Sequence, residues 1–142
     1  MEKLFKLLSD AQSSLFVLFH KTWAFHWNVV GSDFTQLHQL FGGQYETMFE
    51  EIDRLSEHMG YLNIKPLSSL SRMLEVTQIQ EAASSTTANN MLSELLENNE
   101  KFCELTQSKF VAQNLRMVFC VLVWKILFLT IRNNARLRLV TI

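Results

Sequence analysis

The apolar residues of this chain recur at steps of three and four residues, the spacing that puts side chains on one face of an α-helix. A first stripe of this kind predicts a long helix from Leu4 to Val30, ended by Gly31. Large side chains widen this stripe beyond one buried face: Phe5, Phe16, Val17, Trp23 and Trp27. We therefore expect a second contact there, with another subunit, and the alternative is a helix at the centre of a crowded bundle.

A second stripe predicts a helix from about Asp33 to Met59 that is closed by Gly60. Asp33, or the serine before it, is the expected N-cap. The residues expected to face the core are Phe34, Leu37, Phe41, Tyr45, Met48, Phe49, Ile52, Leu55 and Met59. Glu50 and Glu51 are expected on a solvated face of the same helix.

Residues 60–86 are predicted to form a crossover between this helix and a third long one. Pro66 opens the crossover, and residues 67–74 predict a short helix within it. The polar cluster at 84–90 predicts a loop and an N-cap, after which a third helix runs from Met91 to Phe110. Long helices joined by a crossover that contains a small helix are a feature of ferritin-like bundles. The predicted fold class is therefore all-α, a ferritin-like four-helix bundle formed by a single domain, residues 1–142.

The C-terminal segment, residues 111–142, is atypical because its stretch from Met117 to Ile131 is apolar on every side except at Lys125. Three interpretations stay open. The first is a membrane anchor, although these residues fall short of the roughly 20 that span a bilayer. The second is a fully buried fourth helix in which Lys125 is paired or extends to the surface. The third is that the segment is read out of frame, which the nucleotide sequence of the gene would test.

Charge is distributed unevenly over a chain whose net charge is only −1. All of the acidic residues lie at or before Glu104, so the main body is acidic and the C-terminal segment is basic. An acidic body without a basic arm argues against DNA binding. The two cysteines form no CxxC pattern, and the N-terminus carries charges where a targeting signal would be apolar. We therefore expect a cytoplasmic protein.

Four polar residues carry the candidate chemistry: His26, His38, Asp53 and Glu57. Neutral imidazole and carboxylate are ligands that iron and zinc accept without thiolate. Asp53 and Glu57 are four residues apart on one helix face, where a cation would relieve their repulsion. The two histidines lie on opposite sides of the turn that Gly31 marks. The alternative is that the histidines are hydrogen-bonded core residues and the carboxylates are solvated.

The pattern that contains these residues, HWNVxG followed by LH and DxxxE, resembles the DNA-binding protein from starved cells family (Dps), the mini-ferritins. The resemblance covers residues 1 to about 104 in helix pattern and is sharp over 25–59. It implies a ferroxidase site with His26 and His38 from one subunit and Asp53 and Glu57 from its two-fold neighbour. It also places Trp27 beside the iron. By resemblance, the protein forms a homo-oligomer, the family's dodecamer, that oxidises Fe(II) with peroxide or oxygen and stores Fe(III) mineral.

One position departs from the family pattern. Where many members carry a further Asp one turn after the second histidine, this chain has Gly42, followed by Gly43. The second iron position of the site is therefore in doubt, because Glu46 would replace that Asp only through a shift of the helix or through water.

The sequence leaves two other functions to weigh against this one, a conventional ferritin site and a non-catalytic role. A conventional ferritin site uses Glu-x-x-His, and no histidine of this chain follows a glutamate at that spacing. The alternative from another class is a non-catalytic helical interaction protein, or a membrane-associated one, whose metal site is vestigial. The sequence argues against membrane association because of the short apolar stretch.

Overall fold

The computed structural model describes residues 2–82 and 87–111. The predicted fourth bundle helix and the open interpretations of the C-terminal segment fall on residues from 112 on, outside the described part. The helices are α1 (Glu2–Asn28), α2 (Phe34–Tyr61), α3 (Leu70–Val76) and α4 (Ala88–Val111). The prediction of long helices with a short helix in the crossover is confirmed. Within the described ranges, no helix is both long enough and apolar enough to cross a bilayer.

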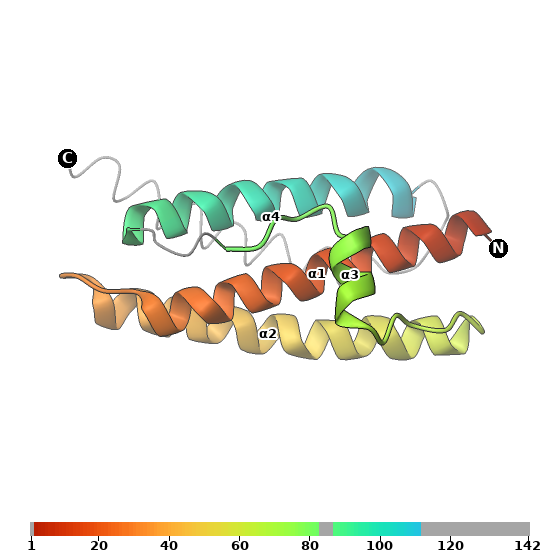
Figure 1. Cartoon of the computed structure of the whole chain (residues 1–142), viewed down its shortest axis with the longest axis horizontal. Coiled ribbons are helices and arrows are strands. Elements are labelled where there is room, and N and C mark those ends of the chain that lie inside the picture. The colour runs from red at the N-terminus through yellow and green to blue at the C-terminus, as the bar shows by residue number, and fades with distance from the viewer. Residues whose placement is uncertain (1, 83–86, 112–142) are drawn as a thin grey trace.

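Helix α1 is the centre of the described arrangement and contacts α2, α3 and α4 (Figure 1). The chain reverses between α1 and α2, so these two helices are antiparallel. The crossover that contains α3 carries the chain back along the molecule, and α4 therefore runs in the same direction as α2. Two long helices that follow one another in sequence are thus parallel, as a crossover connection requires.

The core lies along the predicted apolar stripes. Its fully buried side chains include Leu8, Leu18, Leu37, Phe41, Met48, Met59 and Leu95. Two residues of α2 that were predicted to face the core are exposed instead, Phe34 by 45% and Phe49 by 64%. The prediction that Glu51 is solvated is also wrong, since it is 2% exposed and pairs with Arg54 at 2.7 Å. The reason is helical position: Glu51 follows Met48 by three residues and precedes Leu55 by four, on the buried face.

The helix ends differ from their predicted positions by a few residues, and each end has a local cause. Helix α1 stops at Asn28, and Gly31 lies in the following turn with φ of +117°, which side chains rarely adopt. Helix α2 continues past Gly60 and ends in a Schellman motif. Asn63, with φ of +57°, is the left-handed residue of this motif, and the Ile64 amide donates to the Met59 carbonyl (2.9 Å).

The caps of the other helices are polar side chains. Asp33 occupies the N-cap position of α2 as predicted, but its side chain makes no capping hydrogen bond. Helix α3 begins at Leu70 instead of residue 67 because the Ser69 hydroxyl accepts from the Arg72 amide at 3.4 Å. Helix α4 begins before Met91, because the Thr87 hydroxyl accepts from the Asn90 amide at 3.3 Å.

Buried polar contacts fix the crossover and α4 against α1. The Gln12 amide nitrogen donates to the Ser56 hydroxyl (3.1 Å) and the Leu67 carbonyl (3.3 Å), while its oxygen accepts from the Leu67 amide (2.9 Å). Lys21, only 1% exposed, donates to Glu94 of α4 at 2.7 Å. Because buried polar groups are costly unless paired, these contacts define the relative positions of the helices.

Candidate metal centre

The turn between α1 and α2 brings the two predicted histidine ligands into contact. His26 is in the last turn of α1, and His38 is in the second turn of α2. Their rings are stacked with centroids 3.7 Å apart and planes inclined by 20°. Phe34 also stacks on His38, with ring centroids 5.0 Å apart, and both histidines are half-buried. The sequence predicted the two imidazoles on opposite sides of a turn, and in the structure they lie side by side.

Reciprocal hydrogen bonds set the tautomer of both rings. His26 Nδ1 lies 2.8 Å from the carbonyl oxygen of His38, and His38 Nδ1 lies 2.9 Å from the carbonyl oxygen of His26. A carbonyl oxygen can only accept, so each Nδ1 carries the hydrogen and donates it. In the neutral imidazole, each Nε2 then keeps its lone pair. This is the arrangement in which a backbone carbonyl orients a histidine for metal binding through its other nitrogen.

Gly42, the position that departs from the family pattern, lies directly against the histidine pair. A Cβ atom built on Gly42 would be 3.4 Å from Cε1 of His26 and 3.5 Å from Nδ1. The neighbouring Gly43 has no such atom within 4 Å. Gly42 therefore lets the His26 ring lie close to the backbone of α2, and any side chain at this position would touch the ring.

The two predicted carboxylate ligands lie elsewhere on the same chain. Asp53 and Glu57 are both exposed on α2. Asp53 follows His38 by fifteen residues of one helix, which separates their backbone positions by about 22 Å. Among the described residues, no group of three or more His, Cys, Asp or Glu side chains is close enough to hold a metal ion. Within one chain, the structure brings the histidines together and leaves the carboxylates apart from them.

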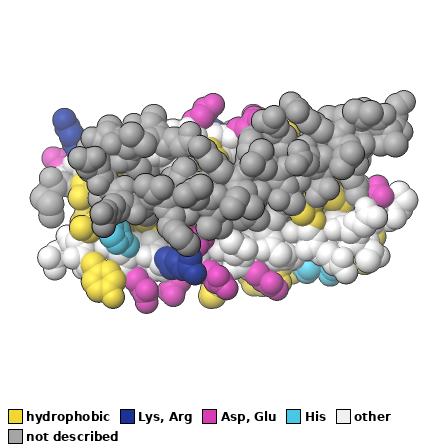
Figure 2. Space-filling model, turned by 180° about the vertical axis from the view of Figure 1, so that it is seen from behind, with side chains coloured by type: hydrophobic (Ala, Val, Ile, Leu, Met, Phe, Trp, Pro, Cys, Tyr) yellow, Lys and Arg dark blue, Asp and Glu magenta, His cyan; other side chains and the backbone are white. Residues whose placement is uncertain are grey.

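The surroundings of the carboxylates are acidic and open. Figure 2 shows acidic side chains along the edge of the molecule that α2 forms. Asp53 and Glu57 lie on this helix with Glu46 and Glu50, all four exposed. This surface attracts cations by its charge, and the two predicted histidine ligands of the same chain lie at the other end of α2.

Trp27, predicted beside the iron, is the last tryptophan of α1 and is 54% exposed. Its ring contacts Trp23, with centroids 4.5 Å apart, and lies edge-on to His20 at 6.3 Å. Its place relative to a bound metal stays a prediction.

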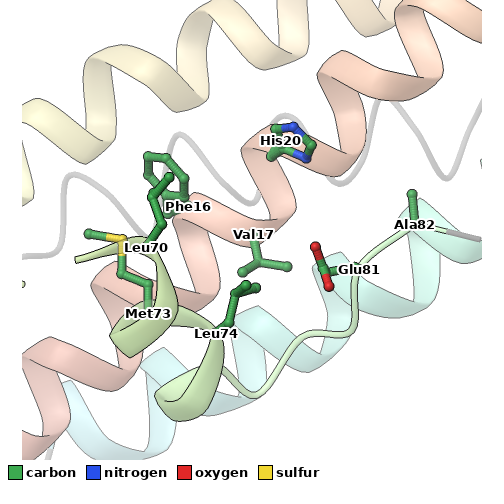
Figure 3. A pocket seen from close by; sticks show the side chains of 8 residues that line it. All are labelled: Phe16, Val17, His20, Leu70, Met73, Leu74, Glu81 and Ala82. Carbon is green, nitrogen blue, oxygen red and sulfur yellow. The ribbon is translucent and has the colours of Figure 1, made fainter. Parts of the chain in front are cut away.

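A separate pocket of about 130 Å³ lies between α1 and α3 (Figure 3). Its lining is mostly apolar and includes Phe16, Val17, Leu70 and Leu74, with His20 and Glu81 as its polar members. None of the four predicted metal ligands lines it, so this pocket is distinct from the histidine pair.

Tyr45 is a residue of the site that sequence reasoning placed only in the core. Its ring is 5.2 Å from that of His26, edge to face at 68°, and 5.8 Å from that of Trp23. The signal that would have identified it is its position seven residues, or two helical turns, after His38. That spacing puts Tyr45 and His38 on the same side of α2.

The family model of the ferritin-like domain matches residues 5–108. The chain is also 32% identical over 114 residues to DNA protection during starvation protein 2 of Bacillus anthracis, a match that covers 80% of this chain and 78% of the relative.

Solved structures show the same fold. Dps from Thermosynechococcus elongatus matches 96% of this chain and 87% of its own, with a TM-score of 0.80 at 22% identity. A Dps protein from Vibrio cholerae, described as a member of a broad superfamily of ferritin-like diiron-carboxylate proteins, matches 93% and 88% with a TM-score of 0.71 at 24% identity. The predicted ferritin-like fold class is therefore confirmed.

Proposed function

Because this chain belongs to the Dps family of ferritin-like proteins, we propose that it binds Fe(II), oxidises it and stores the product as an Fe(III) mineral. Iron storage and protection are what membership of this family supports. The more specific proposal is that Fe(II) is oxidised at a site formed by His26, His38, Asp53 and Glu57. Removing Fe(II) and peroxide together would protect the cell from oxidative damage.

The observation that carries the proposal is the oriented histidine pair. Each Nδ1–H is held by a backbone carbonyl at 2.8 or 2.9 Å, so both Nε2 atoms are free of hydrogen and available to Fe(II). Imidazole together with carboxylate is a donor set suited to iron.

The remaining ligands come, in this proposal, from a second subunit. The carboxylate pair lies about 22 Å along α2 from His38, so one chain does not complete the site. In a two-fold dimer the same surface contacts itself, and each chain gives its histidines to one site and its carboxylates to the other. Two equivalent sites per dimer follow. A homo-oligomer, with the family's dodecamer as the specific proposal, is therefore part of the mechanism.

The chain's own residues perform the following steps. The acidic surface of α2 draws Fe(II) toward the interface. His26 and His38 bind it through Nε2, and Asp53 and Glu57 of the partner subunit balance its charge. Peroxide or oxygen accepts the electrons, and the Fe(III) product passes to the mineral.

The test is rapid mixing of anaerobic Fe(II)-loaded protein with peroxide, followed in the near ultraviolet, with light scattering on the same sample. The proposal predicts an oligomer that oxidises Fe(II) much faster than buffer does and retains the product. A monomer, or an oligomer that oxidises Fe(II) no faster than buffer, would contradict it. That result would favour the alternative of a helical protein with a vestigial site.

Gly42→Asp should add a second Fe(II) to each site. The new carboxylate would start beside the His26 ring, since a Cβ at this position lies 3.4 Å from His26 Cε1. We expect anaerobic calorimetric titration to give one Fe(II) per site in the natural chain and two in the variant. Gly43→Asp is the matched control because a Cβ there meets no atom within 4 Å, and its stoichiometry should not change. Two Fe(II) per site in the natural chain would refute the prediction.

A further inference from the structure

Four exposed carboxylates form one row along α2. They are separated by four, three and four residues, which places them within about 60° of one another around the helix axis. Their order along the helix is Glu46, Glu50, Asp53 and Glu57. The proposed site uses only the last two. The row therefore continues from the assigned pair toward the middle of α2.

The proposed site fixes how α2 meets the α2 of its two-fold neighbour. His38 of each chain lies at the carboxylate pair of the other, so the two helices run antiparallel and cross near their middles. One step of four residues toward the middle covers about 6 Å. Taken from both ends, this step brings residue 42 of one chain opposite residues 50–51 of the other.

Gly42 leaves room at this point, and Glu50 is the residue placed to use it. A Cβ on Gly42 would lie 3.4 Å from His26 Cε1, and the glycine puts no side chain there. Of the two residues that the partner brings opposite, Glu51 is 2% exposed and is held by Arg54 at 2.7 Å. Glu50 is exposed and belongs to the row of carboxylates. It is therefore the acidic side chain that the partner presents to the open position.

The charge of the oxidised ion gives a third carboxylate a role. The two oriented imidazoles are neutral, so the partner subunit's Asp53 and Glu57 balance the two charges of Fe(II). Oxidation to Fe(III) leaves one positive charge over. At a subunit interface, which holds less water than a free surface, an unbalanced charge is costly. One more carboxylate makes the site with its product neutral.

We propose that the partner subunit's Glu50 is a third carboxylate ligand of the iron, in the place that Gly42 leaves open beside the histidine pair; this inference rests on the proposed function. Glu50 binds the same ion as the other ligands, so each site still takes one Fe(II). Each Fe(II) gives one electron to the oxidant. Two Fe(II) and two protons from solvent reduce one peroxide to two water molecules, and Glu50 changes neither count.

Glu50→Gln tests the inference because glutamine keeps the shape of the side chain and removes its charge. Glu46→Gln is the matched control, since Glu46 is exposed in the same row and lies about 6 Å further from the assigned pair. Anaerobic calorimetric titration with Fe(II) measures the affinity. We expect Glu50→Gln to weaken it by about tenfold or more. Glu46→Gln should stay within about twofold of the natural protein, because salt screens a charge at that distance.

A second variant returns the carboxylate from the other side of the interface. Gly42→Asp, combined with Glu50→Gln, should restore the natural affinity at one Fe(II) per site. Gly43→Asp in the same background should not, because a Cβ there meets no atom within 4 Å. Light scattering and circular dichroism on each variant measure assembly and helix content, which should not change.

Mixed assemblies of His38→Ala and Asp53→Ala subunits identify the chain that supplies Glu50. Their intact site takes its carboxylates from the His38→Ala subunit. Glu50→Gln on that subunit should slow Fe(II) oxidation at the intact site. Glu50→Gln on the Asp53→Ala subunit should leave the rate unchanged. A merely structural effect of the substitution would not depend on which subunit carries it.

Two results would overturn the inference, and they have different meanings. If the natural protein binds and oxidises Fe(II) but Glu50→Gln behaves like Glu46→Gln, Glu50 is not a ligand and the proposed function stands. The same conclusion follows if Glu50→Gln acts equally on either subunit. If the natural protein neither binds nor oxidises Fe(II), the proposed function fails and this inference fails with it.

Discussion

Replacing His38 with alanine should abolish rapid Fe(II) oxidation and leave the helices intact. The variant removes one of two oriented imidazoles together with its hydrogen bond to the His26 carbonyl, whereas His26 Nδ1 keeps its acceptor, the backbone carbonyl of residue 38. Loss of an orienting partner alone costs 10–100-fold in metal affinity or activity, so loss of a ligand should reduce the rate by more than about 100-fold. Rapid mixing with peroxide measures the rate, and far-ultraviolet circular dichroism measures helix content.

His58→Ala is the matched control, because His58 lies in the last turn of the same helix α2 and is also half-buried. This variant should oxidise Fe(II) at the natural rate. The stability of His38→Ala should fall by only about 1 kcal/mol, the typical net contribution of one hydrogen bond. A folded His38→Ala protein with the natural oxidation rate would show that the histidine pair is not part of the oxidation site.

Replacing Glu94 with glutamine should destabilise the fold. Lys21 is 1% exposed, and its ammonium nitrogen lies 2.7 Å from Glu94 and 3.4 Å from the Asn98 side-chain oxygen. Glutamine keeps the shape but leaves a buried cation without its counter-charge. Removing one partner of a buried pair costs 3–5 kcal/mol, and the 26% exposure of the Glu94 side chain places the expected loss near the lower end, at about 3 kcal/mol.

Urea unfolding at a fixed protein concentration measures this loss, since the stability of an oligomer depends on concentration. Glu97→Gln is the control because Glu97 lies on the same helix and is exposed. It should change the free energy of unfolding by less than about 0.5 kcal/mol. Equal changes in the two variants would mean that the pair between α1 and α4 contributes little.

The helices and the histidine pair were predictable because their signals are local. Apolar spacing defined α1 and α2, and Gly31 marked the turn that brings His26 and His38 together. The Schellman end of α2 was missed because Asn63, and not the glycine before it, takes the left-handed conformation.

Long-range contacts were not predictable from spacing. Lys21 and Glu94 are 73 residues apart in sequence, and no local pattern pairs them. Likewise, periodicity does not distinguish an apolar residue of the core from one of an exposed surface, which is why Phe49 was placed in the core. The contact between Gly42 and His26 depends on the register of two helices, so the sequence indicated only that a carboxylate was missing there.

The central claim is that one site takes its histidines and its carboxylates from different subunits. It is tested by producing His38→Ala and Asp53→Ala subunits together, with a different affinity tag on each, and isolating assemblies that carry both tags. Each variant alone should be inactive. In a dodecamer assembled at random, half of the two-fold pairs contain both variants, and one of the two sites in each such pair is intact.

The account therefore predicts that mixed assemblies regain about a quarter of the natural Fe(II) oxidation rate per subunit. If mixed assemblies form and stay as inactive as the separate variants, the histidines and carboxylates do not meet across an interface, and the proposed site is wrong.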